Sequence, residues 1–332
     1  MLIVWSKVIR ILVGSTLSAL ACATLVAQPV CNHDSSAAAA LARLRAAMAH
    51  GRFIAYQPTS LQVVNGRPRQ ADAASIRADL ALLRPRFDSL ITYGAAHGAE
   101  AIPTIAASFG FRAVIVGVWN PFDAAELHAA LAAAKDNPTL VAGLSLGNEM
   151  VFGRRTGFAE LAALIAQVHV QAPRVPISTT EPFHMFYDRA ASPLLGRLDF
   201  LLVNVHPIFQ PWFRNAPDGN AAQFVVNVLA KLSDTYCGPI LVKETGVPTA
   251  PQEAGYTEQR QSSFYGELRR RLPPSGTQAF AYFSAFDAPW RVRDANPIPG
   301  EHPAEAHWGL YDAQRRPKAV VAQLPLLNAP AP

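Results

Sequence analysis

Two glutamates each stand where an apolar run of residues ends. The stretch LSLGNE carries Glu149 directly after Asn148, and the stretch ILVKE carries Glu244. Apolar runs of this length are typical of buried strands, and a polar residue at the end of such a run is expected at a surface. Two carboxylates that meet at one site can divide acid–base work, because one can be held protonated while the other stays ionised. The fold must decide whether these two meet.

Short apolar runs recur along the chain and alternate with segments whose apolar residues are spaced three and four positions apart. We expect strands at residues 53–56, 87–92, 113–118, 141–146, 175–179, 200–205, 240–242 and 279–283. We expect helices at residues 73–83, 123–134, 158–170, 221–232 and 257–272. The expected strands lack strict alternation, as parallel strands covered on both faces do. The sequence therefore predicts a single-domain (β/α)8 barrel. The alternative is a doubly wound open sheet, but no glycine-rich phosphate motif follows an early strand.

A closed barrel would bring the ends of all its strands to one mouth, where barrel enzymes place their chemistry. Glu149 would end the fourth strand and Glu244 the seventh, so their side chains would face each other. The other candidate site residues at expected strand ends are aromatic, amide-bearing or acidic: Tyr56, Tyr93, Asn148, His206, Phe209, Asp287 and Trp290. Such side chains suit the faces and hydroxyls of sugars, whereas a phosphate site would need Lys, Arg and glycine loops.

Two facing carboxylates are what cleavage of a glycosidic bond requires. One protonates the leaving oxygen and the other attacks or activates water, at a separation of about 5 to 5.5 Å in retaining enzymes. The amide of Asn148 could bond the sugar 2-hydroxyl, and alternation along the strand would turn Lys243 away from the mouth. Each feature also has a plain structural explanation, because an Asn–Glu pair can cap a helix and Glu-Thr-Gly can form a turn. The placement of both glutamates at strand ends favours catalysis.

With these motifs in order, the chain resembles glycoside hydrolase family 17, the β-1,3-glucanases, over residues 53–318. The resemblance rests on the segments FIAYQPTSLQ, ITYG, VIVGVW, LSLGNE, VNVHPIF, KETGVP, FSAFDAPW and EAHWGLYD. It implies Glu149 as general acid/base and Glu244 as nucleophile, with Asn148 holding the substrate and Tyr56 and Tyr93 lining the cleavage subsite. It also implies that further residues complete the cleft: His206, Phe209, Asp287, Trp290 and Glu305.

The resemblance further implies retention of anomeric configuration, no metal and no cofactor. Some members of the family transfer the glucosyl chain to a sugar instead of water. Two positions depart from the family pattern, because Val247 stands where a tryptophan is common and Arg291 where a lysine is common. Arginine keeps the charge but not the compact ammonium geometry. Both changes bear on substrate length and on the balance of hydrolysis and transfer.

The N-terminus has the pattern of a secretory signal. Lys7 and Arg10 precede an apolar stretch rich in Ala, Leu and Val, and small residues follow at cleavable positions. We expect residues 1–27 to be a signal peptide, with a membrane anchor as the alternative, residues 28–50 to be a lead-in segment and residues 51–325 to form the barrel. An exported chain, periplasmic or extracellular, could oxidise Cys31 and Cys237, but the sequence leaves that pairing open.

Charge and composition indicate which classes of partner the chain can bind. The net charge of +5 is spread along the chain, and Arg269–Arg271 reads as a solvated helix end rather than a nucleic-acid patch. A metal-dependent barrel hydrolase would carry His-x-His at the end of the first strand, where Ala55-Tyr56-Gln57 stands. We expect a monomer that binds β-1,3-glucan and no nucleic acid. A glucosyltransferase or a non-catalytic glucan-binding barrel are the alternatives, and endo or exo action stays open.

Overall fold

The computed structural model describes residues 28–32, 36–64, 67–293 and 300–327. The predicted signal segment, residues 1–27, lies outside the described residues. Among the residues that are described, no helix is long and apolar enough to cross a membrane.

Eight parallel strands close into a barrel, which confirms the predicted (β/α)8 fold. In barrel order they are β1 (Phe53–Ala55), β4 (Ser89–Ile91), β5 (Ala113–Val118), β6 (Val141–Asn148), β7 (Ile177–Pro182), β8 (Leu201–Asn204), β9 (Ile240–Glu244) and β10 (Gln278–Tyr282). Each expected strand overlaps an observed one. Barrel closure is made by the pairing of β1 with both β4 and β10.

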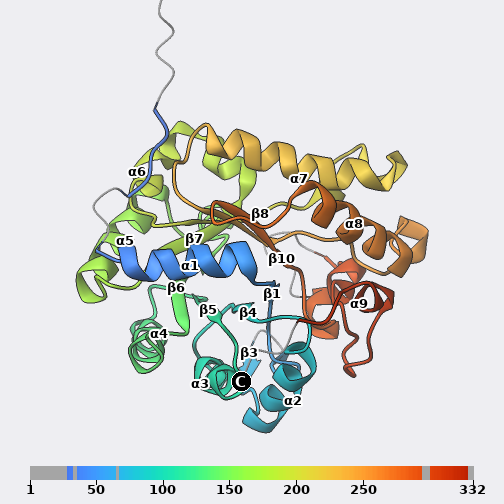
Figure 1. Ribbon diagram of the computed structural model, residues 1–332, viewed down its shortest axis with the longest axis horizontal. Coiled ribbons are helices and arrows are strands. Elements are labelled where there is room, and N and C mark those ends of the chain that lie inside the picture. The colour runs from blue at the N-terminus through green and yellow to red at the C-terminus, as the bar shows by residue number, and fades with distance from the viewer. Residues whose placement is uncertain (1–27, 33–35, 65–66, 294–299, 328–332) are drawn as a thin grey trace, which may run out of the picture.

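Helices surround the strands (Figure 1) and cover their outer faces. They are α2 (Ala73–Leu83), α3 (Ile102–Ser108), α4 (Ala124–Asp136), α5 (Phe158–Gln171), α6 (Ser192–Leu195), α7 (Asp218–Ser233), α8 (Glu258–Arg271) and α9 (Ala319–Ala322). Asp72, Asp123 and Thr257 cap the starts of α2, α4 and α8, because each side chain accepts a backbone N–H of the first turn. Helices α2, α4, α5, α7 and α8 agree with the sequence prediction, whereas the short α3, α6 and α9 are not among the expected helices.

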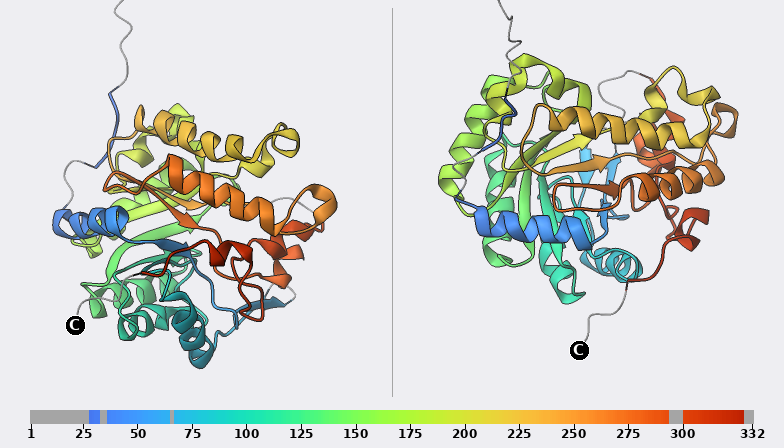
Figure 2. Two further views of the ribbon diagram at one scale, coloured as in Figure 1. Left: turned by 45° about the vertical axis from the view of Figure 1, so that its right-hand side comes forward. Right: turned by 45° about the horizontal axis from the view of Figure 1, so that its top comes forward.

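Helix α1 (Ala38–His50) precedes the barrel and packs against its inner residues. Leu44 and Met48 are fully buried in a cluster with Phe53, Phe200 and Leu241. Because these barrel residues lie near the starts of their strands, α1 closes the end of the barrel opposite the mouth. Figure 2 shows this helix, in blue, beside the barrel strands.

A disulfide joins the segment before α1 to the connection between α7 and β9. Cys31 and Cys237 are bonded, with their Cα atoms 5.4 Å apart. Next to it, Val30 forms a parallel bridge with Tyr236. The pairing that the sequence left open is therefore present, and it lies at the end of the barrel where strands begin.

One element at the mouth has no counterpart in the sequence prediction. Strands β2 (Gln62–Val64) and β3 (Arg67–Arg69) form an antiparallel hairpin in the connection from β1 to α2. Its residues are largely exposed, so they carry no buried apolar pattern that would have revealed it.

Candidate active site

Glu149 stands directly after the last residue of β6 in an unusual backbone conformation. Its φ is 54° and that of Gly147 is 84°, in the left-handed region that costs a side-chain-bearing residue energy. The register between β6 and β7 shifts between Ser145 and Asn148, and the backbone N–H of Glu149 donates to the Thr180 carbonyl at 2.7 Å. This local distortion at the strand end fixes the backbone from which the Glu149 carboxylate reaches the mouth.

The environment of the Glu149 carboxyl favours its protonated form. Its Oε1 accepts one hydrogen bond, from Asn204 Nδ2 at 2.9 Å. Burial raises the pKa of Glu149, and the negative charge of Glu244 raises it further, against the weaker effects of Asn204, His206 and Lys243. The two carboxylates are therefore close enough to act on each other electrostatically.

Glu244, the last residue of β9, is held in its ionised form although it is only 6% exposed. Burial alone would raise its pKa, but the hydrogen bond from His206 and the positive charge of Lys243 outweigh burial and hold the pKa of Glu244 below its ordinary value. His206 Nε2 lies 3.4 Å from Oε2, and Lys243 Nζ lies 3.9 Å from Oε1. Two neighbouring carboxyls thus have pKa values displaced in opposite directions.

Lys243 points into the mouth, so the prediction that strand alternation turns it away is wrong. Its Nζ donates to Asn148 Oδ1 at 2.8 Å and lies 4.2 Å from the centre of the Tyr93 ring. The reason is an irregularity between β8 and β9: Val203 pairs with Val242 and Asn204 with Glu244, which leaves Lys243 as an extra residue. A bulge of this kind breaks the alternation of side chains.

Several polar atoms at this mouth are buried without a hydrogen bond. Among the described residues, those without a hydrogen bond include Tyr93 Oη, Asn204 Oδ1, His206 Nδ1 and Glu244 Oε1. Buried polar groups are nearly always paired in folded proteins, and four such atoms in one place suggest that a polar ligand completes the pairing. Sugar hydroxyls, which both donate and accept, fit this need.

The two tyrosines expected at the cleavage subsite occupy different surroundings. Tyr93 is at the mouth, where burial and then the Glu244 carboxylate raise its pKa well above the usual value. Tyr56 has no exposed surface, and its hydroxyl donates to Asp79 at 2.9 Å. Tyr56 therefore lies behind the mouth and does not line the subsite as predicted, because Asp79 of α2 draws its hydroxyl away.

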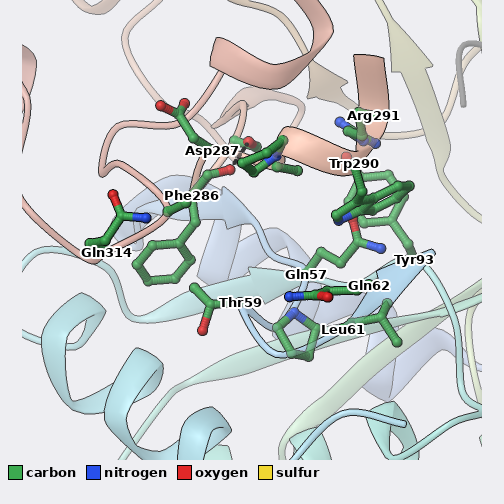
Figure 3. Close-up of a pocket in the computed structure, with 15 residues that line it drawn as sticks. Gln57, Thr59, Leu61, Gln62, Tyr93, Phe286, Asp287, Trp290, Arg291 and Gln314 are labelled. Atoms are coloured by element: carbon green, nitrogen blue, oxygen red, sulfur yellow. Dashed lines mark hydrogen bonds between the residues drawn. The ribbon is translucent and has the colours of Figure 1, made fainter. Parts of the chain in front are cut away.

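A pocket of about 320 Å³ extends from Tyr93 along the ends of β1 and β10. Figure 3 shows Tyr93, Trp290 and Arg291 on one side of it and Phe286 and Gln314 on the other. The pocket lining does not include either catalytic candidate, and Tyr93 is the side chain that connects the pocket to Glu244. The aromatic and amide-bearing walls suit the body of a sugar chain whose reacting bond lies beside the carboxylates.

The remaining predicted cleft residues lie around this arrangement. His206 meets the Phe209 ring edge-on and the Trp308 ring at a tilt, with centroids 5.6 and 5.1 Å apart, and Phe209 is 63% exposed. Glu305 accepts from the Trp308 indole at 3.1 Å. Asp287 lines the pocket, but one of its oxygens is taken by Lys318 and the Gly309 N–H.

The two departures from the family pattern have different consequences. Val247 is fully buried in the core, so it offers no surface to a substrate. Arg291 lies over three rings at the pocket, those of Tyr93, Phe283 and Trp290, at 5.6 to 5.8 Å. Its planar guanidinium therefore acts as part of the pocket wall.

Within the described residues, no group of three or more His, Cys, Asp or Glu side chains has an arrangement that could hold a metal ion. The cations at the mouth are instead the protein's own Lys243 and Arg291.

Sequence reasoning missed three residues that support the carboxylates. The alternation rule turns Lys243 away from the mouth, and Asn204, at the end of β8, is not among the predicted site residues. Glu181, at the end of β7, is completely buried and accepts the backbone N–H groups of Val151 and Phe152 at 2.8 and 3.1 Å. Its position at a strand end was the available signal.

The family model for the BtgE/BtgC glycoside hydrolase domain matches residues 54–309. A glucan 1,3-beta-glucosidase of Arthroderma benhamiae is 30% identical over 267 residues, covering 74% of this chain and 84% of that protein. A probable beta-glucosidase btgE of Emericella nidulans is 26% identical, and the match covers 52% of this chain but only 31% of that longer protein.

Solved structures share the fold. A glycoside hydrolase family 17 beta-1,3-glucanosyltransferase from Rhizomucor miehei superposes with a TM-score of 0.63 at 22% identity, covering 81% of this chain and 96% of that one. An endo-laminarinase from Formosa gives a TM-score of 0.62 at 18% identity, covering 82% of this chain and 86% of that one. At these identities the likeness concerns the barrel alone.

Proposed function

Because the chain belongs to the BtgE/BtgC glycoside hydrolase domain family, we propose that it is a retaining glycosidase of β-1,3-glucan with Glu149 as general acid/base and Glu244 as nucleophile. The observation that carries the proposal is the opposite displacement of the two pKa values, raised at Glu149 and lowered at Glu244. An acid that keeps its proton beside a carboxylate that does not is the division of roles that glycosidic cleavage needs.

The first step breaks the glycosidic bond. The Glu244 carboxylate attacks the anomeric carbon while Glu149 gives its proton to the leaving oxygen, so that the leaving sugar departs as a neutral alcohol and a glucosyl ester remains. The His206 hydrogen bond keeps Glu244 ionised for attack in the free enzyme. Glu149 is left as a carboxylate, ready to act as a base.

The second step releases the sugar. Glu149 takes a proton from an incoming water as its oxygen attacks the anomeric carbon, and the Glu244 ester is cleaved back to a carboxylate. Each step inverts the anomeric configuration of the sugar, so the two steps together retain it. A sugar hydroxyl in place of water would give transfer by the same chemistry, so the acceptor decides between hydrolysis and transglycosylation.

The substrate class rests on the relatives and on the pocket. The Arthroderma protein is named for action on glucan 1,3-linkages, and it matches this chain over most of its own length. The pocket beside the carboxylates offers aromatic and amide side chains, with Trp290 and Gln57 among them. These features support a neutral glucan chain as the substrate.

Glu244→Gln and Glu149→Ala test the assignment with laminarin as substrate. Glu244→Gln should lose turnover while its thermal melting stays near that of wild type. Glu149→Ala should be inactive on laminarin but regain activity with azide and an activated aryl glucoside, because the aryl group leaves without an acid and azide attacks the glucosyl ester directly without a base, giving a glucosyl azide and the free Glu244 carboxylate. The exposed Glu253→Gln serves as the matched control. Unchanged laminarin hydrolysis in Glu244→Gln would exclude this residue as nucleophile.

We also propose that the chain is exported and acts as a monomer, with residues 1–27 as its signal or anchor. The Cys31–Cys237 disulfide supports export, since such bonds persist in oxidising compartments. The test is recovery of the native chain outside the cytosol, with N-terminal sequencing to distinguish a cleaved signal from a retained anchor.

A further inference from the structure

We infer that Lys243 is a positioning residue of the active site, which turns the Asn148 amide toward the substrate and stabilises the charge of Glu244. This inference rests on the proposed function of the same site. It concerns a buried side chain that donates to Asn148 and lies beside Glu244.

Lys243 is surrounded by the polar and aromatic side chains of the active-site mouth. Its side chain is 1% exposed, and its Nζ reaches both Asn148 Oδ1, at 2.8 Å, and Glu244 Oε1, at 3.9 Å. The Tyr93 ring lies under the ammonium at 4.2 Å. The charged groups that act on Lys243 are Glu244 on its own strand, Glu149 after β6 and Arg291 beyond β10. A buried ammonium with these partners lies at the centre of the site.

The hydrogen bond to Asn148 fixes which way that amide faces. An ammonium group has donors only, so it must meet the amide oxygen of Asn148 and not the NH2 group. The NH2 group therefore points away from Lys243, where it can donate to a sugar hydroxyl. The backbone carbonyl of Asn148 also accepts a hydrogen bond from Arg155, so main chain and side chain of this residue are both held. In this way Lys243 prepares a donor without touching the sugar.

The second effect is electrostatic. Burial lowers the pKa of Lys243 to about 8, with the negative charges of Glu244 and Glu149 opposing the shift. At neutral pH most of the Lys243 side chains are therefore charged, and this charge is among the causes that lower the pKa of Glu244. Loss of the ammonium should make Glu244 easier to protonate.

Lys243→Met tests both effects, because methionine fills a similar volume with neither charge nor donor. With an aryl β-glucoside we expect kcat to fall roughly 10- to 100-fold, below the loss of about 10² to 10³ seen when a direct transition-state donor is removed. The loss should be much smaller with the 2-deoxy glucoside, which lacks the hydroxyl that Asn148 is proposed to bind. Combined with Asn148→Ala, the losses should be less than additive, because part of each loss passes through the same amide.

The electrostatic effect of Lys243 on Glu244 can be tested by a titration that requires no catalytic activity. Side-chain carboxyl carbons of glutamate, followed by NMR and assigned with Glu244→Gln, should show a higher pKa for Glu244 in Lys243→Met than in wild type. If the wild-type protein hydrolyses no glucan, the proposed function fails, while this titration still decides the role of Lys243.

Two controls separate positioning from simple structural support. Lys135→Met removes an exposed lysine at the end of α4 and should change nothing. Lys243→Gln keeps a donor for Asn148 but no charge, so it should recover part of kcat with the Glu244 titration still shifted, and it serves if the methionine variant does not fold. Additive losses with Asn148→Ala would overturn the role through the amide. An unshifted Glu244 titration would overturn the electrostatic role.

Discussion

Glu149 and Glu244 are the same side chain in two different surroundings. Glu149 has one amide donor, from Asn204, whereas Glu244 has His206 and Lys243 beside it. Glu244 is buried and Glu149 is half-buried, and burial acts to raise both pKa values, so the opposite directions come from the number and charge of their neighbours. Their roles in catalysis would be set by the strands around them, because Asn204, His206 and Lys243 come from β8, the loop after it and β9.

The pH dependence of turnover should report these surroundings. The proposed mechanism needs Glu244 ionised and Glu149 protonated, so kcat/KM should fall at low pH through the lowered pKa of Glu244 and at high pH through the raised pKa of Glu149. His206→Phe removes the hydrogen bond to Glu244 and raises its pKa. The acid limb of kcat/KM should therefore move to higher pH, measured with an aryl glucoside.

The alkaline limb provides an internal comparison for that experiment. His206 also lowers the pKa of Glu149, but burial, Glu244 and Asn204 each affect that pKa more than His206 does. The alkaline limb should therefore also move to higher pH, by a smaller amount than the acid limb. The exposed His128→Gln is the control and should leave both limbs in place. An acid limb that does not move in His206→Phe would remove His206 from the account of Glu244.

At the scale of single residues, the sequence predicts which residues stand at strand ends but not where their side chains point. Glu149 and Glu244 could be placed at strand ends because apolar runs stop there. The orientation of Lys243 could not be read, since the extra residue in β9 exists only in its pairing with β8. The sequence also could not predict that the Tyr56 hydroxyl donates to Asp79, because Asp79 lies on a helix that approaches Tyr56 only in the folded chain.

At the scale of elements, buried carboxylates hold the loops of the mouth. Glu126 of α4 accepts backbone N–H groups from Ala95, Trp119 and Asn120 at 3.0, 2.7 and 2.9 Å. Glu181 of β7 does the same for Val151 and Phe152. Each carboxylate ties a loop to a neighbouring strand or helix, and charged acceptors make stronger hydrogen bonds than neutral ones. The loops that carry Tyr93 and Glu149 are anchored in this way.

Glu181 should make stability depend on pH. Burial raises its pKa from 4.5 to about 7 in the folded state, so the folded protein binds this proton more tightly than the unfolded chain. The contribution is fully present below pH 4.5 and is lost as the pH rises through about 7, by at most about 3 kcal/mol. The difference in unfolding free energy between wild type and Glu181→Gln should follow that course in urea titrations.

The exposed Glu160→Gln on α5 controls for the general effect of removing a carboxylate. Its difference from wild type should vary less with pH than that of Glu181→Gln over the same interval. A Glu181→Gln difference that is equally flat would mean that burial does not perturb this carboxyl. In either case the variant also reports on the loop after Glu149, through kcat on laminarin.

Regular elements were the most predictable part of the fold. The apolar spacing located α2, α4 and α8 within a few residues, and the structure adds the caps at Asp72, Asp123 and Thr257. The β2–β3 hairpin, α6 and α9 were missed because they are short or exposed, so burial imposes no period on them. These irregular pieces follow strand ends, and Gln62 of the hairpin lines the pocket.

At the scale of the whole molecule, the barrel has one chemical end and one structural end. The carboxylates and the pocket lie where the strands end, and α1 with the Cys31–Cys237 bond lies where they begin. The separation of 206 residues between the cysteines means that the bond ties the lead-in segment to the region before β9. Helix α1 and the disulfide should therefore affect the stability of the fold without changing the catalytic rate.

Removal of the disulfide should separate these two ends by experiment. A bond that closes so long a loop restricts the unfolded chain, and removing it should cost roughly 2–5 kcal/mol of unfolding free energy. We expect Cys31→Ser/Cys237→Ser to unfold at lower urea than the oxidised wild type and to be insensitive to reductant, whereas reductant should bring wild type down to the variant. Activity on laminarin at temperatures below unfolding should be unchanged, because the mouth is at the other end of the barrel. A parallel loss of kcat would show that α1 and its tether shape the mouth through the barrel core.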